Sequence, residues 1–273
     1  MPQSALVPPR VRHTEPVMGT VVSFDLCPGA LSAEQCRRAL RRACGVLHGV
    51  DAMFSTWKPD SPVSRLRRAE LRFDELPPEV SAVLRRCREV RELSGGWFDP
   101  WAMPGGVDPT GFVKGWAAQR ASDVLAEAGI AAAMVNAAGD VVTFGTPEDE
   151  RPWRIGIRGP LRPDRLWCAV DLNGALATSG HYERPGQVLD PHTRRPAHGA
   201  LSASVTGPDL GTADALATGL LAAGVEGLRH VAAADGYAGY VIRRGGVVSV
   251  TPGFPAAFRP RRYPENAQPE PTR

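Results

Sequence analysis

Short strands joined by tight turns constrain the fold of this chain more than any other feature. Residues 131–144 predict two strands around a bend at 139–140. Three further strands are predicted at residues 153–158, 166–172 and 174–178. Parallel neighbours need a crossover of a dozen or more residues, whereas antiparallel neighbours can be joined by a short turn. The sequence therefore predicts a sheet that is mostly antiparallel.

Amphipathic helices are interleaved with these strands. Ser32 and Gln35 form a capping-box pattern before a helix that is predicted to reach about Val50. A second helix is predicted from about residue 78 to residue 94, and another from Thr212 to about residue 223. Further strands are predicted at residues 20–26, 200–205, 237–242 and 247–250. This alternation predicts the α+β class, with antiparallel-rich mixed sheets flanked by helices.

Composition and charge exclude several classes of partner. The net charge is +3 over 273 residues and the basic residues are dispersed, which argues against nucleic acid. No apolar run approaches the ~18 residues of a membrane span, so no membrane insertion is expected. The five cysteines show no metal-binding spacing, and we interpret them as reduced thiols in a cytoplasmic protein.

The length suggests one principal domain. We assign it to residues 15–258, between a flexible N-terminal arm at 1–14 and a flexible tail at 259–273, because both ends are rich in proline and charge. A homo-oligomer is left open.

Residues 107–125 form a candidate anion site, because a loop leads through glycine and lysine into a helix. Asp108 and Gly111 precede Lys114, and apolar residues then repeat at helical spacing. The backbone N–H groups and dipole of a helix N-terminus favour an anion such as phosphate. Lys114 is one of two lysines among 32 basic residues, and a compact ammonium suits a point contact with phosphate. An ordinary helix N-terminus with a solvated lysine is the alternative.

Two predicted loops contain large aromatic residues, which are rare in plain surface loops. Trp57 lies in a proline-rich loop at residues 54–65, and Trp97 and Phe98 stand beside Asp99 between two pairs of glycines. These aromatics could form a wall for a flat ligand, with Asp99 accepting hydrogen bonds. The alternative is an aromatic corner that packs beneath a loop.

Asp214 and Thr218 are four residues apart on the helix predicted from Thr212 and therefore share one face. A carboxylate and a hydroxyl on one face suit a hard cation such as Mg²⁺, which prefers oxygen ligands. The alternative is an ordinary helix start in which Asp214 is a favourable first-turn charge and Thr218 bonds back to the backbone.

Eight segments, in order, resemble the motifs of the ApbE-like FAD:protein FMN transferases. They are MGT at 18–20, FSTWKPDSPVSR at 54–65, GWFDP at 96–100, DPTGFVKGWAAQR at 108–120, NAAGDV at 136–141, ATSGHYER at 177–184, LDPHTRRP at 189–196 and ADALATGL at 213–220. Each match is weak alone, but together they span about residues 16–252, which is most of the chain. The resemblance implies the ApbE-like fold.

The resemblance also implies a reaction and its residues. The expected reaction is the Mg²⁺-dependent transfer of FMN from FAD to a threonine, or a serine, of a target flavoprotein, with release of AMP. Nine residues are expected to contact FAD: Met18, Trp57, Trp97, Phe98, Asp99, Asp108, Lys114, Val188 and Leu189. Gly111, Asp214 and Thr218 are the expected metal ligands, and the target is expected to carry a short motif that contains threonine.

Several positions depart from the family pattern. Gln187 stands where the family usually has a histidine, and glutamine cannot take a proton at neutral pH. His181, Asp190 or Asp108 could act as the base instead, although His181 could equally be a solvated loop histidine. Arg194 replaces a glycine of the family motif.

Three hypotheses about function follow from these observations. The first is the Mg²⁺-dependent flavin transferase, in which Lys114, His181 and Asp190 are the candidate catalytic residues. The second is an FAD pyrophosphatase that uses the same site with water as acceptor and yields FMN and AMP. The third is a non-catalytic FAD-binding protein, which Gln187 favours, whereas Asp214, Thr218 and Lys114 favour the first two.

Overall fold

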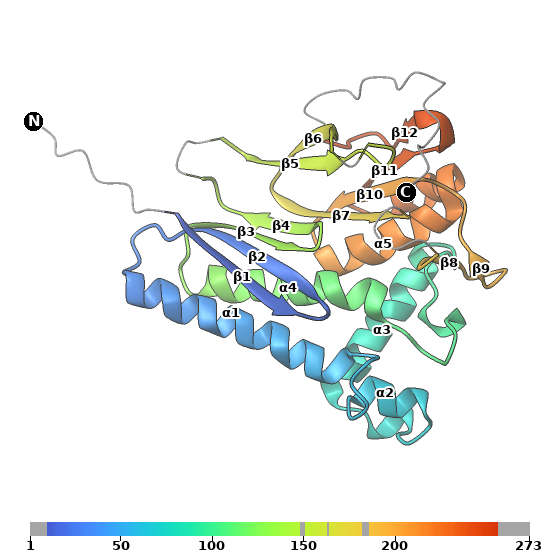
Figure 1. Cartoon of the computed structure of the whole chain (residues 1–273), viewed down its shortest axis with the longest axis horizontal. Helices are drawn as coiled ribbons and strands as arrows, with labels where there is room; N and C mark the ends of the chain where they lie inside the picture. The colour runs from blue at the N-terminus through green and yellow to red at the C-terminus, as the bar shows by residue number, and fades with distance from the viewer. Residues whose placement is uncertain (1–9, 148–150, 163, 182–185, 256–273) are drawn as a thin grey trace, which may run out of the picture.

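The structure, a computed structural model, describes residues 10–147, 151–162, 164–181 and 186–255. It has three layers (Figure 1): helices cover one face of a central sheet, and a separate hairpin covers the other. Among the described residues, no helix is both long enough and apolar enough to cross a membrane.

The central sheet has eight strands in the order β1-β2-β3-β4-β7-β10-β11-β12. Each neighbouring pair in this sheet is antiparallel, which confirms the α+β class and the antiparallel-rich pairing expected from the short turns. The strands are β1 (Val11–Val17), β2 (Thr20–Cys27), β3 (Ala132–Ala137), β4 (Asp140–Phe144), β7 (Gly174–Gly180), β10 (Ser202–Gly207), β11 (Ala238–Ile242) and β12 (Val248–Val250). The hairpins β5 (Trp153–Arg158) with β6 (Leu166–Leu172), and β8 (Leu189–Asp190) with β9 (Arg195–Pro196), are separate two-stranded sheets.

Six α-helices occur in the described part of the chain: α1 (Ala33–Phe54), α2 (Pro62–Arg67), α3 (Pro78–Leu93), α4 (Thr110–Glu127), α5 (Leu210–Ala223) and α6 (Leu228–Ala233). Helix α4 packs between α1 and α5, and α5 also packs on β7 and β10. Four short 3-10 segments accompany them: η1 (Phe73–Glu75), η2 (Pro100–Ala102), η3 (Gly224–Gly227) and η4 (Arg244–Gly246).

The core lies on both faces of the central sheet because neighbouring residues of a strand point to opposite faces. In β2, Val22, Phe24 and Leu26 are buried against the helical layer. In β7, Leu176 belongs to the opposite cluster beneath the β5–β6 hairpin, while Ala175 belongs to the helical side. The central strands therefore need apolar residues at consecutive positions.

The first predicted helix begins as its sequence indicates. The Ser32 side chain accepts from the Gln35 backbone at 3.3 Å, and the Gln35 side chain accepts from the Ser32 backbone at 2.8 Å. This capping box confirms the predicted start, and α1 runs to Phe54, four residues beyond the predicted end.

Three local predictions need correction. Residues 11–14, assigned above to a flexible arm, belong to β1, which pairs with β2 along its whole length; residues 1–9 and the tail at 259–273 lie outside the described residues. Helix α2 begins inside the predicted loop at residues 54–65, where Ser61 caps it. Helix α5 begins at Leu210 rather than Thr212, because Asp209 caps it by accepting from the Thr212 backbone at 2.8 Å.

The hairpin of β3 and β4 turns one residue earlier than predicted. Ala137 pairs with Asp140, so Ala138 and Gly139 form the turn, with φ of +54° and +99°. Two consecutive positive φ values are typical of a type I′ turn, whose twist matches that of the strands it joins. This register makes Asp140 the first residue of β4, and it is 1% exposed.

Candidate active site

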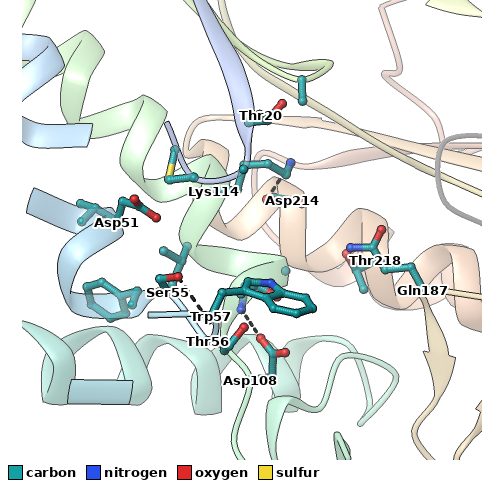
Figure 2. A pocket seen from close by; sticks show the side chains of 18 of the residues that line it. Thr20, Asp51, Ser55, Thr56, Trp57, Asp108, Lys114, Gln187, Asp214 and Thr218 are labelled. Carbon is teal, nitrogen blue, oxygen red and sulfur yellow. Dashed lines mark hydrogen bonds and ion pairs between the residues drawn. The ribbon is translucent and has the colours of Figure 1, made fainter. Parts of the chain in front are cut away.

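A cavity of about 780 Å³ opens where the ends of several elements meet (Figure 2). Its size is typical of ligand sites. The walls come from the β1–β2 turn, the end of α1 and the loop after it, the start of α4, the end of β7, and α5. Eight of the twelve expected FAD- and metal-binding residues line this cavity: Met18, Trp57, Asp108, Gly111, Lys114, Val188, Asp214 and Thr218.

Lys114 is the centre of an ionic cluster. It forms ion pairs with Asp140 of β4 and with Asp214 of α5, and its nitrogen lies 3.2 Å from Asp214 Oδ2. Asp140 accepts from the Thr178 backbone N–H at 3.0 Å, and Asp214 accepts from that of Gly115 at 3.1 Å. Three segments that are distant in the sequence are therefore joined at this point. Lys114 is not the solvated helix-start lysine of the alternative considered above.

The balance of charge in this cluster is negative. Asp140 and Asp214 are buried. When all three groups are ionised, the two carboxylates carry two negative charges and Lys114 carries one positive charge. Burial raises the pKa of Asp214 above its ordinary value, and the Lys114 ammonium and the Gly115 N–H oppose that shift. A cation added beside Asp214 would favour its ionised form.

Glycines allow the helices that carry the cluster to approach each other. A Cβ on Gly115 of α4 would lie 2.4 Å from the Leu210 carbonyl oxygen, and one on Gly211 of α5 would lie 2.9 Å from the Trp116 Cβ. Neither distance is compatible with a larger side chain unless the helices move apart. The close contact of α4 with α5 is what brings Lys114 to Asp214.

Oxygen atoms gather one turn along α5 from Asp214. The Thr218 hydroxyl lies 3.3 Å from the Ser179 hydroxyl of β7. A Cβ on Gly111 would lie 3.4 Å from that same Thr218 oxygen, so the start of α4 is in direct contact with this point. The structure thus brings together the three expected metal-binding residues, Gly111, Asp214 and Thr218, on one side of the cavity.

Trp57 is at the rim of the cavity and is 92% exposed (Figure 2). A tryptophan normally buries most of its large apolar ring, so this exposure beside the cavity makes Trp57 a candidate contact for a ligand. Its loop begins directly after α1, whose last residue, Phe54, is buried edge-to-face against Trp116. The loop therefore rests on a fixed base.

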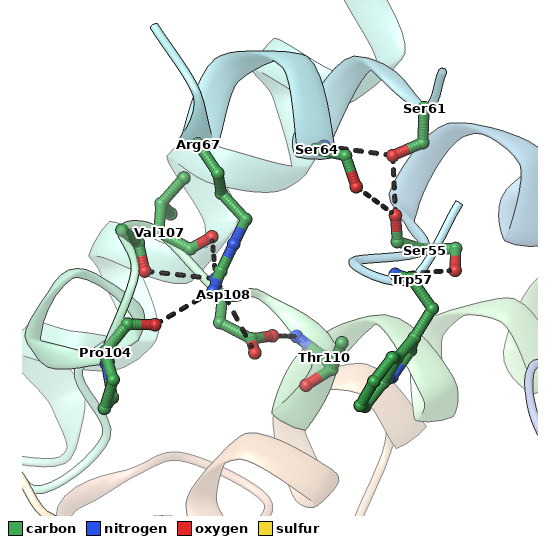
Figure 3. A network of polar contacts seen from close by, with 10 residues as sticks. Ser55, Trp57, Ser61, Ser64, Arg67, Pro104, Val107, Asp108 and Thr110 are labelled. Atoms are coloured by element: carbon green, nitrogen blue, oxygen red, sulfur yellow. Dashed lines mark hydrogen bonds and ion pairs between the residues drawn. The ribbon is translucent and has the colours of Figure 1, made fainter. Parts of the chain in front are cut away.

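Serines hold the Trp57 loop in place (Figure 3). The hydroxyls of Ser61 and Ser64 donate to the Ser55 carbonyl at 2.6 and 3.0 Å. The Ser55 hydroxyl accepts from the backbone N–H of Trp57 at 3.2 Å. These contacts give the serines of the 54–65 segment a structural role, which is to fix the position from which Trp57 projects.

Asp108 is held at the opposite side of this network. Its carboxylate accepts from the Thr110 backbone N–H at 3.0 Å and lies 3.8 Å from the Arg67 guanidinium. Arg67 also donates to the carbonyls of Pro104, at 2.9 Å, and Val107, at 2.9 Å. The loop that leads into α4 is therefore anchored to α2, and Asp108 faces the cavity.

The aromatic wall expected from Trp97 and Phe98 does not border the cavity. Phe98 is 4% exposed and packs beneath Gly111, whose Cβ position lies 3.3 Å from its ring. Trp97 packs edge-to-face on His192 with ring centroids 4.7 Å apart. Asp99 caps the short η2 segment and pairs with Arg91 at 2.7 Å. Phe98 therefore packs behind a cavity residue, as the alternative of an aromatic corner describes, and Trp97 and Asp99 contact residues outside the lining.

Two of the candidate catalytic residues also stand away from the cavity lining. Asp190 accepts from the His192 backbone at 2.8 Å within the β8–β9 hairpin, and Leu189 pairs with Pro196 there. His181 follows the cavity residue Gly180 but is not part of the lining. Burial, followed by the charges of His198 and Arg244, holds the pKa of His181 below its ordinary value of 6.5.

Gln187 and Val188 do line the cavity. Gln187 occupies the position at which the motif usually has histidine, and its amide offers hydrogen bonds without a titratable proton. Arg194, which replaces the motif glycine, has a φ of +57°, the left-handed region that favours glycine.

Asp140 was not predicted as a site residue. It was interpreted as part of a bend, although the NAAGDV segment contains it. The signal that could have identified it is a carboxylate directly after a two-residue turn, at the start of a strand that is otherwise apolar. Its partner, Lys114, is 26 positions earlier, and no local pattern connects the two.

A family model described as the ApbE family matches residues 18–106 and 103–241. These two ranges cover most of the chain and contain the cavity residues described above. The chain belongs to the ApbE family. This confirms the resemblance that was based on eight short segments.

Curated relatives carry one common description. A protein of Rhodobacter capsulatus described as "FAD:protein FMN transferase" is 34% identical over 251 residues, which is 85% of this chain and 46% of that protein. One of Escherichia coli strain K12 with the same description is 32% identical over 151 residues, 51% of this chain and 43% of that protein. The chain spans less than half the length of these family members.

Solved structures of the family share the fold. The ApbE protein of Thermotoga maritima superimposes with a TM-score of 0.79 at 23% identity, covering 90% of this chain and 98% of that one. The flavin transferase ApbE of Vibrio cholerae gives a TM-score of 0.76 at 23% identity, with the same coverage. The ApbE-like fold that the sequence suggested is confirmed.

Proposed function

We propose that this chain transfers FMN from FAD to a threonine or serine hydroxyl of a target flavoprotein and releases AMP. The observation that carries the proposal is the cavity of an ApbE-family chain in which Lys114, Asp140 and Asp214 meet beside Thr218. The shared description of the curated relatives supports it.

The residues around Asp214 fit a magnesium ion. The side chains available there, Asp214 and Thr218, offer only oxygen, and Gly111 could add its backbone carbonyl. The surplus negative charge of the Lys114 cluster also favours a cation. A bound Mg²⁺ would neutralise charge that develops on the phosphate oxygens during transfer.

The reaction is a displacement at phosphorus. The acceptor oxygen bonds to the phosphorus of the FMN half of FAD, the bond from that phosphorus to the bridging oxygen breaks, and the bridging oxygen leaves with AMP. We place Lys114 beside the pyrophosphate, where Asp140 and Asp214 fix the position of its ammonium. A charge that is held in advance stabilises the transition state without rearrangement.

The exposed Trp57 ring is our candidate surface for an aromatic ring of FAD. Its loop is held by Ser55, Ser61 and Ser64, so the backbone that carries the ring is already fixed before FAD binds. Met18 and Val188 line the same cavity and would contact the cofactor. We do not assign this role to Trp97, Phe98, Asp99 or Leu189, because they stand outside the lining.

The acceptor hydroxyl must lose a proton, and Asp108 is the base that the geometry favours. Of the three candidates, Asp108 lines the cavity, whereas His181 and Asp190 do not. Its carboxylate is oriented by the Thr110 N–H and lies near Arg67, so it is held toward the ligand space. A base has to be within hydrogen-bond reach of the hydroxyl it serves.

An FAD pyrophosphatase and a non-catalytic FAD-binding protein remain the alternative functions. The pyrophosphatase needs the same cluster with water in place of the acceptor. The binding protein is favoured by one observation: Gln187, which cannot take a proton, lies in the cavity at the usual histidine position.

Release of AMP separates these functions. We would incubate the purified chain with FAD and Mg²⁺, with or without an acceptor protein that carries a threonine-containing motif, and follow AMP by chromatography. AMP that forms only with the acceptor supports transfer, and AMP without it supports hydrolysis. If FAD binds but no AMP forms in either case, the transferase proposal is wrong. Asp214→Ala should abolish release, and Asp108→Asn should reduce it by about 100-fold or more.

We also propose that the protein works in the cytoplasm. Support comes from Cys36, Cys44, Cys87 and Cys168, which are reduced thiols in the structure, as expected in a reducing compartment.

A further inference from the structure

A second cluster of chemically reactive side chains lies between the edge strand β1 and helix α1. His13 and Glu15 are two residues apart on β1 and share one face of the strand, whereas Cys44 and His48 are four residues apart on α1 and share one face of the helix. None of these four residues lines the active-site cavity. The proposed transferase reaction leaves them without a role.

Glu15 joins the members of this cluster. One of its carboxylate oxygens lies 2.9 Å from His13 Nε2, and the other lies 2.8 Å from His48 Nε2. The Cys44 thiol donates a hydrogen bond to the same carboxylate. All four residues are at least partly exposed, so a cation can reach them from solvent.

The donor atoms match the preferences of zinc. The ligand atoms of His13, Glu15 and Cys44 all lie within 4.8 Å of one another. In a tetrahedral zinc site with bonds of about 2.0–2.3 Å, neighbouring ligand atoms are about 3.3–3.8 Å apart. Small side-chain rotations would close that difference. A sulfur and an imidazole nitrogen favour Zn²⁺ over Mg²⁺, which takes oxygen ligands.

We propose that His13, Glu15 and Cys44 bind one Zn²⁺ ion, with water as the fourth ligand and His48 holding the second oxygen of Glu15. Residues that orient a ligand in this way commonly contribute about 10- to 100-fold to metal affinity. The site differs in chemistry from the oxygen-only site at Asp214 and Thr218.

A zinc ion at this position would fasten β1 to α1. Both elements lead directly to the cavity: β1 is followed by Met18 and Gly19, and α1 contributes Val50 and Asp51 to the lining. Val50 lies six positions after Cys44, which corresponds to about 9 Å along the helix. The ion would therefore stiffen one wall of the cavity without contacting FAD. Among the residues that the structure describes, β1 pairs with β2 alone, so the sheet supports it on one side.

Cobalt gives the most direct test, because a Co²⁺–thiolate bond produces a charge-transfer absorption that oxygen and nitrogen ligands do not. The full chain is stripped with a chelator and titrated with Co²⁺, and Zn²⁺ is then added. We expect one equivalent of Co²⁺ to produce the thiolate band, Zn²⁺ to displace it, and one Zn²⁺ per chain to remain after gel filtration. Zn²⁺ should also raise the melting temperature.

Matched variants locate the site. Cys44→Ala should abolish the band, whereas Cys36→Ala, two turns earlier on the same helix, should keep it. His13→Gln, at a partly exposed position, should also abolish tight Zn²⁺ binding. This variant tests the proposal if Cys44→Ala fails to fold. His48→Gln should weaken binding by about 10- to 100-fold. Asp214→Ala should leave the band unchanged, because the two metal sites are separate.

Three results would overturn the proposal. They are Co²⁺ binding without a thiolate band, a band that survives in Cys44→Ala, and failure of the native chain to retain zinc. None of these results bears on AMP release, so the zinc site and the transferase activity stand or fall independently.

Discussion

Lys114 contacts two carboxylates that come from different elements, Asp140 from β4 and Asp214 from α5. Both carboxylates are buried, and the charge on Lys114 offsets part of the cost of burying them in the same small volume. Lys114 and Asp214 could each be predicted as site residues from the sequence, but their pairing could not. The pairing depends on three elements meeting, and no local spacing encodes that.

Replacing Lys114 should therefore expose the repulsion between its partners. We expect Lys114→Met to lower the free energy of unfolding by about 1–3 kcal/mol, which is below the range for a fully buried pair because Lys114 is partly exposed. Adding Asp140→Asn should recover part of this loss. A double-mutant cycle measured by urea unfolding checks the coupling, and strictly additive effects would show that the two residues do not interact.

His181 provides a test of the electrostatics next to the cavity. Its pKa is held below 6.5 by burial first, and then by His198 and Arg244, so the neutral imidazole should dominate at pH 7. Because the folded pKa is lowered, the unfolded chain takes up the proton first, and this group should reduce stability as the pH falls below about 6.5. NMR titration of the histidine ring should give a midpoint below 6.5 that rises in His198→Ala. A midpoint at or above 6.5 would contradict this account.

Among the elements, those with a local start signal and one apolar face were predicted well. Helix α1 has both, since Ser32 and Gln35 cap it and Leu47 and Val50 face the core. Helix α5 has neither clear feature, because it is buried almost all round, and both Asp209 and Thr212 could serve as its cap. Its start was therefore placed two residues late.

The contact between α4 and α5 determines the geometry of the site. Gly115→Ala would place a Cβ against the Leu210 carbonyl, and we expect a loss of about 1–3 kcal/mol of stability together with weaker FAD binding. Gly49→Ala on α1 is the matched control, because nothing lies within 4 Å of its Cβ position. That change should add about 0.5–1 kcal/mol, as alanine usually does within a helix. Thermal unfolding of both variants measures the difference, and equal effects would refute the packing argument.

At the scale of the whole molecule, the class of fold could be predicted but the order of strands could not. Short turns predicted antiparallel neighbours such as β3 and β4. The pairing of β2 with β3, however, joins Cys27 to Ala132, and β4 pairs with β7 across the intervening β5–β6 hairpin. Contacts between such distant segments form because both faces of one sheet are buried at once. Local sequence patterns do not predict these contacts.

The same limit explains the uneven outcome for the site. Trp57 and Asp214 both line a cavity that forms where the ends of strands and helices meet. Trp97 and Phe98 have the same aromatic character in the sequence, but the fold places Phe98 beneath Gly111. Residue type alone does not distinguish an aromatic residue that lines a cavity from one that packs behind the lining.

The central claim is that this cavity transfers FMN to a hydroxyl of a protein acceptor. The most direct measurement is the mass spectrum of an acceptor protein after incubation with the chain, FAD and Mg²⁺, followed by fragmentation to locate the modification. We predict a mass increase of one FMN on a single threonine or serine, which is absent with Asp214→Ala. An acceptor that keeps its original mass, while the chain binds FAD normally, would contradict the account.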